Sequence, residues 1–150
     1  MFCVIVPIGN YYFVLYFMTR VAINGFGRIG RTFFKMAVDN PAFEIVAIND
    51  LGDINNLAYL LRYDTAYGQS GLEVQVGDGQ LMVNGKTIVF SQERDPAQLL
   101  WKTHNIDIVV EATGVFASYE KAKAHLTAGA KRVVVSAPVK DDPAADIAGD

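Results

Sequence analysis

Three glycines at fixed spacing form the part of this sequence best suited to bind a charged group. Gly25, Gly27 and Gly30 follow the apolar run 20–24 and precede a stretch with apolar residues at helical spacing, 29–38. In such a strand–turn–helix context the first glycine permits a tight turn, the second lets an anion approach the backbone, and the third lets the helix pack on the strand. Unpaired N–H groups and the positive end of the helix dipole then favour a phosphate. The alternative is a tight turn without a ligand.

A carboxylate follows the next apolar run. Asp50 comes directly after residues 44–49 and lies slightly further from the first glycine than the ~20 residues usual in dinucleotide-binding motifs. A carboxylate at the end of the second strand accepts hydrogen bonds from two ribose hydroxyls and repels a 2′-phosphate, which favours NAD over NADP. The alternative is that Asp50 only caps a turn or a helix. We therefore expect NAD as the cofactor.

Polar residues also end two later apolar runs. Thr113 and Gly114 follow the run 106–111, and Ser136 ends the run 132–136. Ligands of open α/β sheets bind at the carboxyl edge of the strands, so these residues are expected to face the cofactor. Each is also compatible with an ordinary strand-to-loop turn.

The elements that must position these residues alternate along the chain. The four apolar runs predict strands, and helices are expected at 29–38, after a cap at Asp53, from Asp95-Pro96 through Trp101, and at 118–128. Strands that alternate with helices predict a parallel sheet covered by helices on both faces. The expected fold class is therefore α/β, a Rossmann doubly wound fold.

The middle of the sequence has a different pattern. Residues 72–90 predict two or three short antiparallel strands, with turns at Asp78-Gly79 and Asn84-Gly85. We expect this segment to form an antiparallel hairpin insertion around residues 72–90 in the mainly parallel sheet.

Composition limits the function further. The 150 residues carry a net charge of −3 and no basic run, which argues against nucleic-acid binding. Cys3 is the single cysteine, so no disulfide forms within the chain, and a reducing, cytoplasmic location is expected. No catalytic group and no metal site are expected, because His104 and His125 have no carboxylate or cysteine at ligand spacing. His125 is expected on the surface of a helix.

The first eighteen residues are uncharged and rich in aromatic residues. Their length is at the lower limit for a membrane-spanning helix, but Pro7, Gly9 and Asn10 interrupt them. They also lack the basic region and the small-residue cleavage site of a secretory signal. We expect residues 1–17 to be an apolar extension outside the domain, and residues 18–150 to be the NAD-binding domain, truncated before a catalytic domain. A membrane anchor is the alternative.

Five segments resemble the amino-terminal half of phosphorylating glyceraldehyde-3-phosphate dehydrogenase. They occur in order, with family-like spacing, between Met18 and about Lys140, so together they are more specific than the glycine motif alone. The segments are VAINGFGRIGR (21–31), AINDL (47–51), ERDP (93–96), EATGVF (111–116) and AGAKRVVVSAP (128–138).

The resemblance implies a role for each matching residue. Arg28 and Ile29 would meet the cofactor pyrophosphate, and Asp50 the adenosine ribose. Leu51 and Phe116 would form the walls of the adenine slot, with Arg94 near the adenine. Thr113 and Ser136 would contact the cofactor further along. The full set of expected cofactor-binding residues is Asn24, Gly25, Gly27, Arg28, Ile29, Asp50, Leu51, Arg94, Thr113, Gly114, Phe116 and Ser136.

The resemblance also implies a reaction. In that family a cysteine forms a thiohemiacetal with glyceraldehyde 3-phosphate, hydride passes to NAD, a histidine acts as base, and phosphate releases the product as an acyl phosphate. The cysteine lies in a Ser-Cys-Thr-Thr-Asn segment, which is absent from these residues. We therefore expect this chain alone to bind NAD without turnover. The family implies a homotetramer, although Tyr67-Gly68 and the tail 140–150 depart from its pattern.

Two other functions stay open at this point. Erythrose-4-phosphate dehydrogenase shares the amino-terminal pattern, although Asp50 in place of glutamate favours the triose enzyme. The other alternative is a nucleotide-binding module without catalysis that residues 1–18 tether to a membrane.

Overall fold

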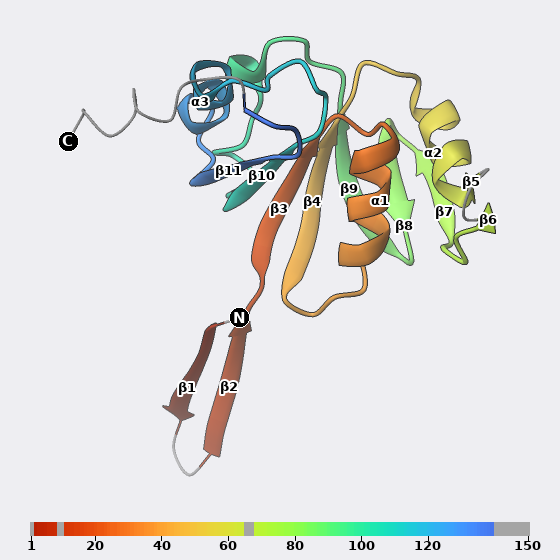
Figure 1. The fold of residues 1–150 in the computed structure, drawn as a ribbon. Helices are drawn as coiled ribbons and strands as arrows, with labels where there is room; N and C mark the ends of the chain where they lie inside the picture. The colour runs from red at the N-terminus through yellow and green to blue at the C-terminus, as the bar shows by residue number, and fades with distance from the viewer. Residues whose placement is uncertain (1, 9–10, 65–67, 140–150) are drawn as a thin grey trace.

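The computed structural model of this chain describes residues 2–8, 11–64 and 68–139. Its main element is a seven-stranded sheet with the strand order β11-β10-β3-β4-β9-β8-β7 (Figure 1). Tyr67 and the tail 140–150, which depart from the family pattern, lie outside the described residues.

Five neighbouring strands of this sheet run parallel to one another. They are β3 (Thr19–Asn24), β4 (Phe43–Asn49), β9 (Lys86–Ser91), β10 (Ile108–Glu111) and β11 (Arg132–Val135). Helix α1 (Arg28–Ala37) connects β3 to β4, and α3 (Tyr119–Thr127) connects β10 to β11. Because β3 has β4 on one side and β10 on the other, the winding reverses at β3. Open α/β sheets bind ligands at such a reversal.

The antiparallel part of the sheet is the expected hairpin insertion. Strands β7 (Val74–Gly77), β8 (Gln80–Val83) and β9 pair antiparallel in sequence. The turn residues Asp78 and Asn84 have φ angles of 50° and 49°, the left-handed conformation that Asx-Gly turns require. Helix α2 (Ile54–Arg62) precedes this part in the chain. Between α2 and β7 lies a short antiparallel pair of strands, β5 (Tyr63–Asp64) with β6 (Gly68–Gln69). The expected fold class is confirmed.

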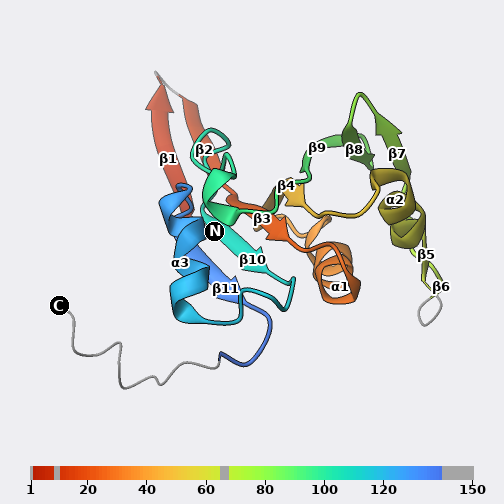
Figure 2. The same cartoon turned by 90° about the horizontal axis from the view of Figure 1, so that it is seen from above.

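Helices cover both faces of the sheet, as Figure 2 shows from above. Successive residues of a strand point to opposite faces, so Val21 and Ala22 of β3 enter different cores. Val21 packs in one cluster with Phe34 of α1 and Leu61 of α2. Ala22 packs in the other cluster, with Trp101, which precedes β10, and with smaller apolar side chains.

The helix expected from Asp95 through Trp101 is shorter than predicted. Asp95 caps a single 3-10 turn, η1 (Pro96–Gln98), and Leu99 is already extended, with φ −70° and ψ 144°. The cap and the proline start a helix, but Trp101 must turn inward to be buried, with 1% of its surface exposed. Burial of a large aromatic side chain outweighs the local helix signal.

The amino-terminal residues form a separate hairpin. Strands β1 (Phe2–Ile8) and β2 (Tyr11–Phe17) pair antiparallel in their own two-stranded sheet, which extends away from the main sheet in Figure 1. Within the described residues, the structure has no helix with both the length and the apolar character needed to cross a bilayer.

Candidate functional site

A pocket of about 360 Å³ opens at the carboxyl ends of four parallel strands. Residues after β3, β4, β9 and β10 all reach it, so it lies where the winding of the sheet reverses. Its lining consists of Asn24, Gly25, Gly27, Asn49, Asp50, Leu51, Glu93, Arg94, Ala112, Thr113, Val115 and Phe116.

The glycine turn forms one side of this pocket, and two of its glycines are required sterically. Gly25 has φ +92°, and a Cβ there would lie 2.6 Å from the backbone nitrogen of Thr113. A Cβ on Gly30 would lie 2.1 Å from the carbonyl oxygen of Gly25. A Cβ on Gly27, in contrast, would meet no atom within 4 Å. The turn is therefore closed around Gly25 and Gly30 and open toward the pocket at Gly27.

The first turn of α1 follows directly. Gly27 is its N-cap, and no described side chain caps the helix or adds an acidic group to the first turn. The first N–H groups of any helix have no partner within that helix. Together with the helix dipole they favour an anion at this position.

Asp50 ties the turn to the end of β4. Its Oδ2 accepts a hydrogen bond from the backbone N–H of Phe26 at 2.6 Å, and its Oδ1 accepts one from Gly52 at 2.8 Å. Asp50 therefore does cap a turn, as the alternative proposed. A carboxylate has about four lone-pair positions, so each oxygen keeps one for a further donor. Both functions are compatible in one side chain.

A row of polar side chains crosses the strands beneath the pocket. Glu111, Asn24, Asn49 and Ser91 are neighbours in the registers of β10, β3, β4 and β9. Asn24 Nδ2 donates to Glu111 at 2.6 Å, Asn49 Nδ2 donates to Asn24 Oδ1 at 2.7 Å, and Ser91 Oγ donates to Asn49 Oδ1 at 2.8 Å. We call these four residues the polar row.

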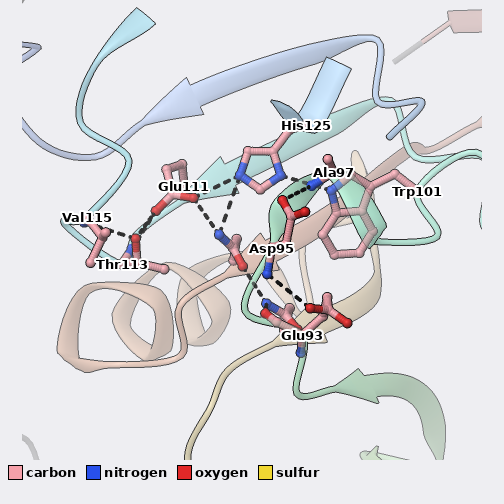
Figure 3. A network of polar contacts seen from close by, with 10 residues as sticks. Glu93, Asp95, Ala97, Trp101, Glu111, Thr113, Val115 and His125 are labelled. Atoms are coloured by element: carbon pink, nitrogen blue, oxygen red, sulfur yellow. Dashed lines mark hydrogen bonds and ion pairs between the residues drawn. The ribbon is translucent and has the colours of Figure 1, made fainter. Parts of the chain in front are cut away.

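Glu111 ends this row as a buried carboxylate, with 1% of its surface exposed. Burial by itself would raise the pKa of Glu111, but hydrogen bonds from His125, Thr113 and Asn24 outweigh burial and lower that pKa below its ordinary value. Figure 3 shows Glu111 between His125 and Thr113.

The expectation that His125 lies on the surface is wrong. His125 is completely buried, and its ring bonds to Glu111 at 2.9 Å and to the indole nitrogen of Trp101 at 3.0 Å. The partners are 14 and 24 residues away in sequence, so spacing along the helix gave no signal for them. The structure shows no group of three or more His, Cys, Asp or Glu side chains suited to a metal within the part it describes.

Most of the expected cofactor-binding residues line the pocket. Arg28 lies exposed at the start of α1, and Gly114, with φ +74°, follows Thr113. Ile29 and Ser136 instead line a separate apolar hollow of about 300 Å³, together with Phe33.

Sequence reasoning missed several lining residues. Asn49 is the register neighbour of Asn24, and Glu93 stands beside Arg94, so strand register and adjacency were the available signals. The remaining two, Ala112 and Val115, flank the expected Thr113 and Gly114.

Three features define a dinucleotide-binding domain of the Rossmann class: the winding of the sheet reverses at the pocket, an uncapped helix follows a glycine turn, and a carboxylate lies at the end of β4. Comparisons with known proteins narrow this class. Residues 19–119 match the family model of the glyceraldehyde 3-phosphate dehydrogenase NAD binding domain. The chain therefore belongs to this family, and its cofactor is NAD.

Similarity to individual proteins supports the same family. Glyceraldehyde-3-phosphate dehydrogenase of Geobacillus stearothermophilus is 53% identical over 123 residues, 82% of this chain and 37% of the relative. Glyceraldehyde-3-phosphate dehydrogenase 1 of Bacillus subtilis is also 53% identical over 123 residues, with the same coverage. The enzyme of Escherichia fergusonii is 52% identical over 123 residues, again 82% of this chain and 37% of the relative. The chain thus spans a little over a third of the length of these relatives.

Proposed function

We propose that the pocket at the ends of β3, β4, β9 and β10 holds the adenosine half of NAD. The observation that carries this proposal is the position of Asp50, which keeps a free lone pair on each oxygen beside the open first turn of α1. Two ribose hydroxyls would use these lone pairs. The pyrophosphate would then lie over Gly27 and the N–H groups of Arg28 and Ile29. Because Gly27 has no Cβ, there is space for it there.

The rest of the pocket fits the remaining groups of the cofactor. Leu51 and Phe116 would hold the adenine ring between apolar surfaces, with Arg94 at its edge. Thr113 would meet the cofactor nearer its middle. Ser136 and Ile29 lie together in the neighbouring apolar hollow, which would place the nicotinamide half there. When bound, NAD supplies the acceptor for a hydride.

At the level of the whole protein, we propose a phosphorylating glyceraldehyde-3-phosphate dehydrogenase that forms a homotetramer in the cytoplasm. The family match and the names of the relatives support this activity. The cofactor domain would begin at residue 18, because β3 begins at Thr19 and strands β1 and β2 belong to a separate sheet.

Calorimetric titration of the chain with NAD, and separately with NADP, tests the cofactor proposal. We expect measurable NAD binding and weaker NADP binding, because the Asp50 carboxylate repels a 2′-phosphate. Equal affinity for both dinucleotides would show that Asp50 does not face the ribose. Absence of NAD binding would refute the site as a whole.

A further inference from the structure

Every hydrogen bond along the polar row runs in one direction. Ser91 donates to Asn49, Asn49 donates to Asn24, and Asn24 donates to Glu111. A carboxylate only accepts, so Glu111 determines that the Asn24 amide faces it with Nδ2 and presents Oδ1 to Asn49. The orientation of Asn24 therefore depends on Glu111, while the backbone N–H and carbonyl of Glu93 also orient Asn49.

His125 approaches Glu111 from α3, on the other side of the row, and its protonation state follows from geometry. The indole nitrogen of Trp101 lies 3.0 Å from His125 Nδ1, and an indole N–H can only donate. Nδ1 must therefore be the unprotonated acceptor, and the proton is on Nε2, which donates to Glu111 at 2.9 Å. Asn24 Nδ2, 3.4 Å from Nε2, is then a neighbouring donor to the same carboxylate and not a hydrogen-bond partner of the ring. The ring is the neutral Nε2–H tautomer, so its contact with Glu111 is a hydrogen bond from a neutral donor and not an ion pair.

Among the described residues, the hydrogen-bond donors to Glu111 are all neutral. His125 and Asn24 donate to Oε2, while the backbone N–H and the hydroxyl of Thr113 donate to Oε1. Figure 3 shows Thr113 and His125 on opposite sides of the carboxylate. Loss of the His125 donor would leave this buried anion with less compensation and free to shift.

The row reaches both walls of the pocket. At one end the Thr113 hydroxyl gives its hydrogen to Glu111 and accepts from the N–H of Val115. This hydroxyl therefore has only a lone pair to offer a cofactor. Toward the other end, next to Ser91, Asn49 Nδ2 donates to the carbonyl of Glu93 and Asn49 Oδ1 accepts from its N–H, which fixes the segment that carries Arg94.

We propose that His125 is a positioning residue for the cofactor, which acts through Glu111 on Thr113 and on the polar row. The inference rests on the proposed NAD site and deepens it. His125 itself is completely buried and does not line the pocket. Its role is to hold Glu111 where Thr113 and Asn24 need it.

The first test needs no substitution in the row. Nitrogen NMR of the ¹⁵N-labelled full chain distinguishes the two neutral histidine tautomers and the cation, and a His104→Gln variant assigns the signals because the chain has two histidines. We expect Nε2 of His125 to carry the proton and Nδ1 to carry none at neutral pH. Protonation of Nδ1, in the other tautomer or in the cation, would overturn the inference.

The second test compares two variants by calorimetry with NAD. His125→Leu removes the donor to Glu111, whereas His125→Gln keeps an N–H near the place of Nε2. We expect the leucine variant to bind NAD about tenfold more weakly, equivalent to about 1.4 kcal/mol, and the glutamine variant to stay within about threefold of the parent. The Thr113 amide signal without NAD should move in the leucine variant and stay near its parent position in the glutamine variant.

The outcomes separate this inference from the proposed function. If the parent chain fails to bind NAD, the proposed site is wrong and the inference falls with it. If the parent binds and both variants bind equally well, the site stands and His125 does not position it. Equal losses in both variants would show that His125 only fills space. If the leucine variant does not fold, the tautomer measurement on the parent still decides.

Discussion

Exchange of Asp50 for asparagine tests the central carboxylate with almost no change in shape. Each oxygen of Asp50 accepts a backbone N–H, from Phe26 at 2.6 Å and from Gly52 at 2.8 Å. An asparagine has one oxygen, so its NH₂ group would face one of these two N–H donors. The substitution therefore removes one charge-assisted hydrogen bond and leaves an N–H without an acceptor.

The size of the effect follows from these contacts. A hydrogen bond to a charged group contributes about 1.5–3 kcal/mol. Asp50 is only half-buried, so solvent recovers part of this loss, and we expect the free energy of unfolding to fall by about 1–2 kcal/mol. For a domain of this size that lowers Tm by about 3–8 °C. The weaker acceptor should reduce NAD affinity by about tenfold, while NADP affinity should change less because the repelling charge is gone.

Asp53→Asn is the matched control. Asp53 caps α2 through one oxygen, Oδ1, which accepts from the N–H of Asn56 at 2.9 Å. Asparagine caps helices about as well as aspartate, so this variant should keep the parent Tm and NAD affinity. Thermal melts and calorimetry of both variants make the comparison. If Asp50→Asn melts and binds NAD like the parent, the assignment of Asp50 to the turn and to the ribose is refuted.

Two more predictions concern the glycine turn and two carboxylates, Glu111 and Asp107. Gly30→Ala would place a Cβ 2.1 Å from the Gly25 carbonyl oxygen and should lower the free energy of unfolding in urea by about 3 kcal/mol. Gly27→Ala has open space for its Cβ, so this variant should keep the parent stability but bind NAD more weakly. Similar stabilities for the two variants would contradict the packing described. The folded-state pKa values of Glu111 and Asp107 lie below their ordinary values of 4.5 and 3.8. For Glu111, hydrogen bonds outweigh the effect of burial. For Asp107, hydrogen bonds from Lys131 Nζ at 2.6 Å and from the Arg20 N–H at 2.9 Å outweigh it, together with the charges of these two residues. The contribution of these two carboxylates to the free energy of unfolding should be full above about pH 5 and be lost as the pH falls through and below these values. Unfolding curves measured between about pH 3 and 7 would show this loss. The free energy of unfolding of Glu111→Gln should depend less on pH.

Much of the fold was predictable because local signals and packing agree. The glycine turn, the Asx-Gly turns at Asp78 and Asn84, and the cap at Asp53 all occur where the sequence predicts them. The 3-10 turn η1 differs, since burial of Trp101 decided that segment and burial is a property of the assembled core.

The candidate site, too, was predictable only in part. Asp50 follows a strand directly, so its place at the sheet edge could be predicted. The pair of Glu111 and His125 could not, because it forms only when β10 and α3 pack together, and neither residue marks the other in sequence. The same holds for Asn24 and Asn49, whose contact depends on the register of β3 and β4.

An amide NMR titration of the full chain with NAD is the most direct test of the proposed NAD site. We predict that the largest chemical-shift changes occur at Arg28 and Ile29, whose N–H groups open α1, and at Leu51 and Thr113 on the two walls of the pocket. Changes confined to residues outside this pocket, with Arg28 and Ile29 unaffected at saturating NAD, would contradict the proposed site.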